Sequence, residues 1–327
     1  MPDISTSPAI SARQQQPTRF GLGILREYGI IFAFLMVFGA LSLLTPAFFT
    51  TRNMLNVLDQ AAQVGLVALG ATVTIIGGGF DLSAGAIFAL AGSIAAFIAR
   101  EGYPGLGLAV GVLVGLLLGF GNGALISGFR VNSFVTTLAS GLIIRGVAYV
   151  LTGGLLIQIK DPVFAFLGRG RFLEAKIPAY FLFGFALLVW FLLSRTTFGR
   201  YVYAIGGNEE ATRLSGVRVA LIRTMTFAIS GLSAGISGVI GASRIATGQA
   251  NVGQGIELSA IAAVVIGGTS IMGGEGAVWR TLFGVLLLQL ISNGMNMLNV
   301  PPFYQLVVQG GVIMLAVSLD ALRHRRP

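Results

Sequence analysis

The sequence contains no cysteine, a single histidine and two lysines, and each shortage excludes a class of function. Without cysteine there is no disulfide framework, no thiolate metal site and no cysteine nucleophile. His324 alone cannot form a histidine cluster, so no metal site is predicted. Lys160 and Lys176 do not follow a glycine-rich G-x-x-x-x-G sequence, so the chain has no P-loop for ATP. The few carboxylates offer no catalytic constellation, and we expect neither enzymatic activity nor a cofactor.

Charge is also scarce, at 10% of residues against 55% hydrophobic residues, and the mean hydropathy is +0.86. These values indicate a polytopic membrane protein. Apolar runs such as 106–120 lack the alternation of a membrane β-strand, so the spans are predicted to be helical. Glycine is abundant, with 47 of 327 residues, which suits closely packed transmembrane helices. The net charge of +9 comes from residues between apolar runs, so no nucleic-acid partner is expected.

Ten apolar segments are long enough, or nearly so, to cross a bilayer at about 20 residues per span. The second, third and eighth are short or interrupted by glycine, which predicts broken or re-entrant helices and eight to ten full crossings. The segments lie near 26–44, 61–79, 84–99, 106–127, 133–152, 177–194, 221–242, 257–272, 281–298 and 303–319.

The distribution of lysine and arginine predicts the orientation of the chain. Ten crossings put both termini on one side, and that side carries thirteen of the 21 Lys and Arg residues. Seven lie on the other side and one falls inside a span, so the positive-inside rule places both termini in the cytoplasm. Residues 1–25 are predicted to be a flexible cytoplasmic tail, 26–319 a single transmembrane domain, and 320–327 a basic cytoplasmic tail.

Small residues form stripes on two of the predicted spans. In the fourth span glycines recur every fourth residue, so another helix can approach closely along that face. The seventh span carries a comparable small-residue face. The glycines of the fourth span are Gly107, Gly111, Gly115, Gly119 and Gly123.

Two glycine-rich segments interrupt apolar runs. The first, 75–85, contains Gly78 and then offers Asp81 and Ser83 as caps for a new helix. A direct role of Asp81 in a translocation pathway is the alternative, because broken helices often border such pathways. The second segment is 267–276, and whether it repeats the first is left open.

Arg145 lies within the fifth span, where an unpaired charge is costly. Its own span contains no carboxylate, so its partner must come from another helix, from backbone carbonyls or from the interface by snorkelling. We expect a structural anchor, with a place in the transport pathway as the alternative.

The longest polar segment inside the cell, 195–220, is predicted to contain a short amphipathic helix. Asn208 caps it, Glu209 and Glu210 lie in its first turn, and Ala211 and Leu214 give it an apolar side. Such a helix is suited to docking on a partner protein, and an interfacial helix without a partner is the alternative.

Five motifs in the expected order resemble the permease subunits of bacterial ABC importers for ribose, arabinose and galactose. The resemblance covers most of residues 27–319. It is carried by 78–85 (Gly-Gly-Phe-Asp-Leu-Ser-Ala-Gly), 137–146 with 152–154, the loop 206–216, and 267–276 and 293–300. Arg280 stands where the family commonly has a small residue, which puts close packing at that helix start in doubt.

The resemblance implies a type II ABC importer permease fold, placed in the bacterial cytoplasmic membrane, with four kinds of partner. Two cytoplasmic ATPase subunits, or one tandem ATPase chain, would push on the cytoplasmic loop 206–216. A second permease chain, identical or related, would complete the pathway, and an extracytoplasmic sugar-binding protein would deliver the substrate. The fourth is the lipid bilayer. The coupling residues are Asn208, Glu209, Glu210, Ala211, Arg213, Leu214, Ser215 and Gly216.

The substrate of such a permease would be a monosaccharide, bound by weak and dispersed polar contacts. Ser133, Thr136 and Ser140 share one helix face and are the preferred pathway lining. The remaining candidates are Asn56, Gln60, Asn122, Thr137, Asn293 and Asn296.

Related ABC permeases for autoinducer sugars, nucleosides or branched-chain amino acids remain open as alternatives. An ion-coupled secondary transporter also uses broken helices, but it usually needs coupling carboxylates, and those seen in the sequence lie at breaks or span ends. A channel or a membrane scaffold would show no dependence on ATP.

Overall fold

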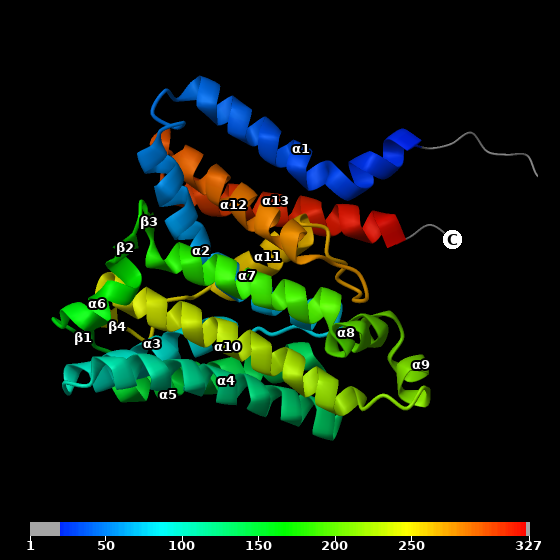
Figure 1. The fold of residues 1–327 in the computed structure, drawn as a ribbon, viewed down its shortest axis with the longest axis horizontal. Helices are drawn as coiled ribbons and strands as arrows, with labels where there is room; N and C mark the ends of the chain where they lie inside the picture. Colours follow the sequence, from blue (N-terminus) through cyan, green and yellow to red (C-terminus); the bar gives the residue numbers. More distant parts are fainter. Residues whose placement is uncertain (1–19, 325–327) are drawn as a thin grey trace, which may run out of the picture.

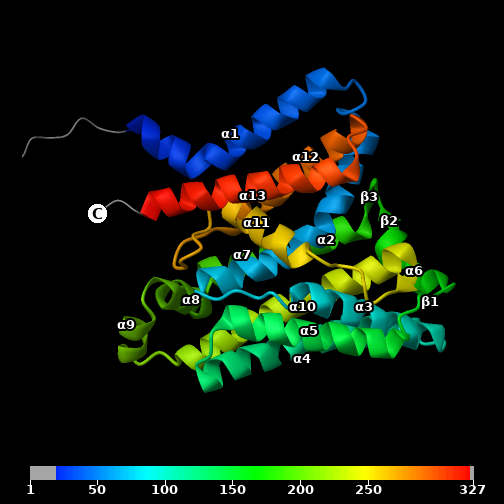
Figure 2. The same ribbon diagram turned by 180° about the vertical axis from the view of Figure 1, so that it is seen from behind.

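The computed structural model describes residues 20–324, and this part of the chain is almost entirely helical. Figure 1 shows the long helices as a bundle, and Figure 2 shows the same bundle from behind. The helices are α1 (Phe20–Leu44), α2 (Thr51–Ile76), α3 (Ala84–Arg100), α4 (Pro104–Phe129), α5 (Ser133–Thr152), α6 (Pro162–Arg169), α7 (Ile177–Arg195), α8 (Thr197–Gly207), α9 (Glu209–Leu214), α10 (Val219–Ile245), α11 (Ile256–Ile266), α12 (Val278–Met297) and α13 (Pro302–His324).

Four two-residue strands form two antiparallel pairs. β1 (Ile157–Gln158) pairs with β4 (Thr247–Gly248), and β2 (Arg171–Phe172) pairs with β3 (Ala175–Lys176). All four lie with α6 at one end of the bundle, whereas α8 and α9 lie at the opposite end (Figures 1 and 2). The first residues of α1 and the last of α13 also lie at the α8–α9 end (Figure 1).

Each of the ten predicted apolar segments coincides with a helix. Within the described residues, six helices are long and apolar enough to cross a membrane, namely α2, α4, α5, α7, α10 and α12. Shorter apolar helices include α3, α11 and the 28–44 part of α1. The chain is therefore an all-helical, multi-pass membrane protein.

Several predicted boundaries are wrong. Helix α2 begins at Thr51, ten residues before the predicted span, because its first turns are polar and lower the local hydropathy. Helix α11 ends at Ile266, where the glycine-rich segment begins. Helix α1 already begins at Phe20 and α13 continues to His324, so 20–25 and 320–324 are helical. The predicted tail residues 1–19 and 325–327 lie outside the described residues.

The core forms where α10 packs against α4, α3 and α2. A β-carbon on Gly115 would lie 2.6 Å from the carbonyl oxygen of Gly231, and one on Gly123 would lie 2.7 Å from the Cα of Thr224. The glycine stripe of α4 thus allows direct backbone contact with α10. Gly107 and Gly111 approach the backbone of α3 in the same way.

Candidate transport and coupling site

Helices α8 and α9 form an elbow outside the long helices. The Thr196 hydroxyl caps α8 by accepting from the Gly199 amide, and the Asn208 side chain caps α9 by accepting from the Ala211 amide at 2.9 Å. The short helix that the sequence predicts after Asn208 is therefore present as α9. The apolar residues Ala211 and Leu214 are exposed, and Leu214 is 80% exposed. Ser215 and Gly216 end the helix, and Gly216 has φ of +84°.

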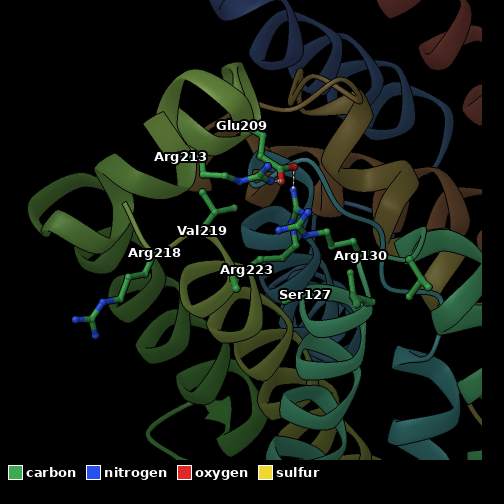
Figure 3. Close-up of a pocket in the computed structure, with 10 residues that line it drawn as sticks. Ser127, Arg130, Glu209, Arg213, Arg218, Val219 and Arg223 are labelled. Atoms are coloured by element: carbon green, nitrogen blue, oxygen red, sulfur yellow. Dashed lines mark hydrogen bonds and ion pairs between the residues drawn. The ribbon is translucent and has the colours of Figure 1, made fainter. Parts of the chain in front are cut away.

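Ion pairs attach α9 to α10. Glu209 pairs with Arg213 one turn along α9 and with Arg223 on α10, and Arg213 also pairs with Glu210 at 3.0 Å. Figure 3 shows Glu209 facing the guanidinium groups of Arg213 and Arg223. Burial raises the pKa of Glu209, but the bond from Arg223 and the charge of Arg213 outweigh this and hold the pKa below its ordinary value. Glu209 is therefore a carboxylate at neutral pH.

The elbow meets both glycine-rich breaks at a junction of backbones. A β-carbon on Gly206, near the end of α8, would overlap the carbonyl oxygen of Ile76 and the amide nitrogen of Gly274. One on Gly273 would lie 3.1 Å from the Cα of Gly78. The Gly274 amide donates to the Ile76 carbonyl at 2.9 Å. The end of α2, the end of α8 and the segment between α11 and α12 are therefore in direct contact.

A buried polar network forms the first break. Asp81 is only 4% exposed and accepts from the amide and hydroxyl of Ser83 and from the Ser230 hydroxyl of α10 at 2.7 Å. Asn122 of α4 donates to the Ser83 hydroxyl at 2.8 Å. Asp81 does not cap α3 directly: Ser83 is the N-cap residue, and its side chain makes no cap hydrogen bond. Asp81 instead connects the break to α10.

Helix α5 also contacts this break. The Ser133 hydroxyl accepts from the Phe80 amide at 3.2 Å, and the Thr137 hydroxyl accepts from the Leu82 amide at 3.0 Å. Ser133 and Thr137 are one turn apart and so reach the same non-helical segment. Gly78 has φ of +76°, a conformation that glycine adopts without strain.

Arg145 uses backbone carbonyls as its partners. Its guanidinium donates to the carbonyl oxygens of Ala250 and Val252, each at 2.7 Å. Both belong to the non-helical segment between α10 and α11, which is 105 or more residues away in the sequence. The two carbonyls lower the free-energy cost of placing a guanidinium within a membrane span, because their hydrogen bonds replace those to water.

The predicted pathway residues separate into two groups. Asn122, Ser133, Thr137 and Asn293 are bonded to other elements of the protein, and Asn293 exchanges two 3.0 Å hydrogen bonds with Asn53.

In the second group, Thr136 and Ser140 bond only to carbonyls of their own helix or its cap, and both are partly exposed on α5. Asn56 is exposed and Gln60 is partly exposed on α2, while Asn296 accepts from Gln305 at 2.8 Å. The structure therefore does not bring the predicted set together at one place.

Sequence reasoning missed a buried charge in α2. Asp59 is 3% exposed and pairs with Lys176 at 2.6 Å and with Arg244 at 3.2 Å. Hydropathy predicts that this span begins at 61, so Asp59 falls outside it, whereas α2 begins at Thr51. The two cations lie far from Asp59 in the sequence, so no local pattern reveals the pairing.

Two cavities accompany these sites. One of about 360 Å³ lies between α2, α11, α12 and α13, and no charged residue is among those that line it. Its uncharged polar residues are Ser259, Gln289, Ser292, Gln305 and Gln309. The other cavity, of about 390 Å³, lies beside α9 and is rich in arginine (Figure 3).

Arg280 leaves the packing of its helix start intact. A β-carbon on Gly267 would lie 2.5 Å from the Arg280 carbonyl oxygen, so the two backbones are in close contact. The guanidinium lies 5.7 Å from the centroid of the Trp279 ring and donates to the Gly268 carbonyl at 3.4 Å. A large residue at this position is therefore compatible with close packing of the helix start, because its side chain lies outside the backbone contact.

Comparison with known proteins identifies the family. Residues 53–317 match the family described as the permease component of the branched-chain amino acid transport system. The chain is 38% identical over 320 residues to the ribose import permease protein RbsC of Escherichia coli, covering 96% of this chain and 98% of that protein. It is 41% identical over 301 residues to RbsC of Bacillus subtilis (91% and 94%). No solved structure matches the chain.

A further relative is the L-arabinose transport system permease protein AraH of Escherichia coli, 37% identical over 326 residues, or 99% of this chain and 98% of that protein. The match extends through the breaks, the elbow and Arg145, and the ATPase of such a transporter resides in a separate subunit. The chain belongs to the family of ABC importer permease components that includes these ribose and L-arabinose permeases.

Proposed function

We propose that the chain forms the transmembrane pathway for a pentose in a binding-protein-dependent ABC importer. The observation that carries this proposal is similarity along nearly the whole chain to permeases named for ribose and for L-arabinose, which are both neutral pentoses. An uncharged solute agrees with the 360 Å³ cavity, because the residues that line it are apolar or uncharged polar ones. Amide and hydroxyl groups there can bond sugar hydroxyls without charge.

The α8–α9 elbow is the docking site for the ATPase. Residues 208–216 present the exposed apolar face of Ala211 and Leu214, and the ion pairs of Glu209 attach that face to α10. Through the junction at Gly206, movement of the elbow reaches both breaks. The partners are two ATPase subunits or one tandem chain, together with an extracytoplasmic binding protein.

The pathway proposal includes a second permease chain, identical or related. Thr136 and Ser140 lie on the outer face of α5, beside the exposed Ile143 and Val147. They can line a pathway only where another chain covers that face. The proposed membrane is the bacterial inner membrane, with both termini and α9 in the cytoplasm, because α9 and the described ends of the chain share one end of the bundle (Figure 1).

The first test is purification of the tagged chain from its native membrane in mild detergent, with mass spectrometry of the proteins that co-purify. We expect an ATPase with a P-loop and a solute-binding protein. Replacing 209–214 by a Gly/Ser linker should remove the ATPase from a chain that still inserts. Retention of the ATPase by that variant would contradict docking at α9, and recovery of an intact chain without any ATPase would contradict the importer.

The second test is uptake by cells that depend on this chain. Labelled ribose and L-arabinose are compared with leucine, since the family description names branched-chain amino acids. Uptake of one pentose that persists with an uncoupler at constant ATP supports the proposal. Uptake of leucine instead, or collapse with the uncoupler, would support the alternative amino acid permease or the ion-coupled transporter.

A further inference from the structure

A cavity of about 390 Å³ lies where the ends of α4 and α10 meet α9. Four arginines line it, Arg130, Arg213, Arg218 and Arg223, with Glu209 as the only carboxylate among the lining residues. Positive charge therefore exceeds negative charge around this cavity. Figure 3 shows Arg130, Arg223 and Glu209 directed toward one region, whereas the Arg218 guanidinium points away from Glu209.

The arginines are unequally neutralised. Arg213 and Arg223 are held by Glu209, and Arg213 also by Glu210. Arg130 and Arg218 are exposed, and neither has a carboxylate within 4.0 Å among the residues whose side chains the structure describes. Of these two, Arg130 directs its guanidinium toward the region of Glu209 and Arg223 and is available there for an anion (Figure 3). Guanidinium binds phosphate oxygens in a bidentate manner.

The surroundings of the cavity are apolar and exposed. Phe129 at the end of α4 is 75% exposed, and Phe134 and Val135 at the start of α5 are exposed beside it. Ile126, Val131 and Val219 line the cavity itself. The 26 residues of α4 span about 39 Å at 1.5 Å per residue, longer than the hydrocarbon core of about 30 Å. The end of α4 therefore lies at headgroup level.

We propose that this cavity binds the headgroup of an anionic phospholipid, with the phosphate at Arg130, beside Arg223, and the acyl chains along the exposed apolar faces of α4 and α5. Basic pockets between membrane helices at the cytoplasmic surface are suited to such headgroups. The bound lipid bridges the α4–α5 turn and the α9–α10 connection. It therefore supports the elbow from the membrane side.

An acidic segment of the ATPase is the competing occupant, and the geometry favours the lipid. Ala211 and Leu214, which are exposed, lie on a different face of α9 from Glu209 and Arg213, which face the cavity. A protein docked on the Ala211–Leu214 face leaves the cavity open toward α4 and α5.

The test is native mass spectrometry of the full-length permease, delipidated and titrated with dioleoylphosphatidylglycerol or dioleoylphosphatidylcholine. We expect the wild-type chain to bind the anionic lipid about tenfold more tightly. Arg130→Gln should reduce this preference severalfold, whereas Arg218→Gln should change it little, because the Arg218 guanidinium points away from this region. The matched control is Arg200→Gln, which removes the same charge from an exposed site on α8 that does not line the cavity. Size-exclusion profiles check that each variant remains folded.

Three results would overturn the proposal. Equal loss of lipid in Arg200→Gln would mean nonspecific attraction. Displacement of the lipid by millimolar inorganic phosphate, with phosphate itself retained, would mean a site for a free anion. Crosslinking from position 130 to the ATPase in a purified complex that carries no anionic lipid would mean that the partner occupies the cavity.

Discussion

The two glycine-rich breaks interrupt helices of similar character, but different contacts hold them. The first, between α2 and α3, contains the buried Asp81 and is bonded by side chains of α4, α5 and α10. The second, between α11 and α12, meets α2 and α8 through backbone contacts, and the Tyr203 hydroxyl of α8 donates to the Gly276 carbonyl at 2.9 Å. The first break is therefore fixed within the bundle, whereas the second is attached to the elbow.

The two breaks therefore differ in role: the first holds neighbouring helices together, and the second is placed to receive movement of the elbow. A buried, fully bonded carboxylate resists displacement, since moving it leaves polar groups unpaired. At the junction the backbones of Ile76, Gly206 and Gly274 are in direct contact, so a displacement of the end of α8 presses directly on its neighbours. We therefore expect a push on α9 to reach the second break first.

The largest effect is expected from Asp81→Ala. The change leaves the buried Ser83 and Ser230 groups without their acceptor, which should lower the free energy of unfolding by roughly 2–4 kcal/mol. The measurement is an SDS unfolding titration in mixed micelles. The control is Glu275→Ala at the exposed Glu275 of the second break, for which we expect a change within about 0.5 kcal/mol. Equal losses in both variants would contradict the distinction between the breaks.

Gly206→Ala tests the backbone junction. The new methyl group would overlap the backbone of Ile76 and Gly274, so about 1–3 kcal/mol of overpacking strain is expected, with loss of uptake in the chains that assemble. The control lies one residue away, since a β-carbon on Gly207 meets nothing within 4 Å. Gly207→Ala should transport normally. Normal uptake by the Gly206 variant would show that the junction has no role in transmission.

The helices could be predicted from the sequence because apolar length is a local property. Each of the ten apolar segments contains a helix, and the Asn208 cap is visible as a residue type at a helix start. The start of α2 was not predictable in the same way. Two of its polar residues have distant partners: Asn53 bonds to Asn293, and Asp59 pairs with Lys176 and Arg244. A hydropathy average does not show such partners.

The assignment of polar residues on α5 shows a second limit. Periodicity places Thr136 on the same face as Ser133 and Ser140, but Ser133 and Thr137 are the residues that reach the first break. Adjacent faces of one helix differ only in what packs against them, which is a tertiary property. The glycine junction has the same origin: the sequence marks Gly78 and Gly273 as parts of two breaks, but no local pattern shows that these breaks meet each other and Gly206 of α8.

Substitutions at Thr136 and Thr137 sharpen this assignment. Thr137→Val removes the acceptor of the Leu82 amide and should lower the free energy of unfolding by about 1 kcal/mol. Thr136→Val loses only a bond to the Asn132 carbonyl, so stability should hardly change. If Thr136 lines the pathway, its replacement by Arg should reduce pentose uptake in a normally assembled complex. Unchanged uptake by Thr136→Arg would remove that face of α5 from the pathway.

The smallest effect concerns the ion pairs of Glu209. Its pKa is below the ordinary carboxyl value in the folded protein, so the pairs stabilise the attachment of α9 at neutral pH and are lost as the pH falls through that lowered pKa. Because Glu209 is partly exposed, Glu209→Gln should lower the stability of the α9 attachment by only about 0.5 kcal/mol.

The measurement is hydrogen exchange at the α9 amides between pH 7 and pH 3. After correction for intrinsic exchange rates, protection of the α9 amides in the wild-type protein should decline only at the acid end of this range. In Glu209→Gln this pH-dependent decline should be absent. The same decline in both proteins would assign it to another carboxylate, and Glu210, which also pairs with Arg213, would then be the next residue to replace.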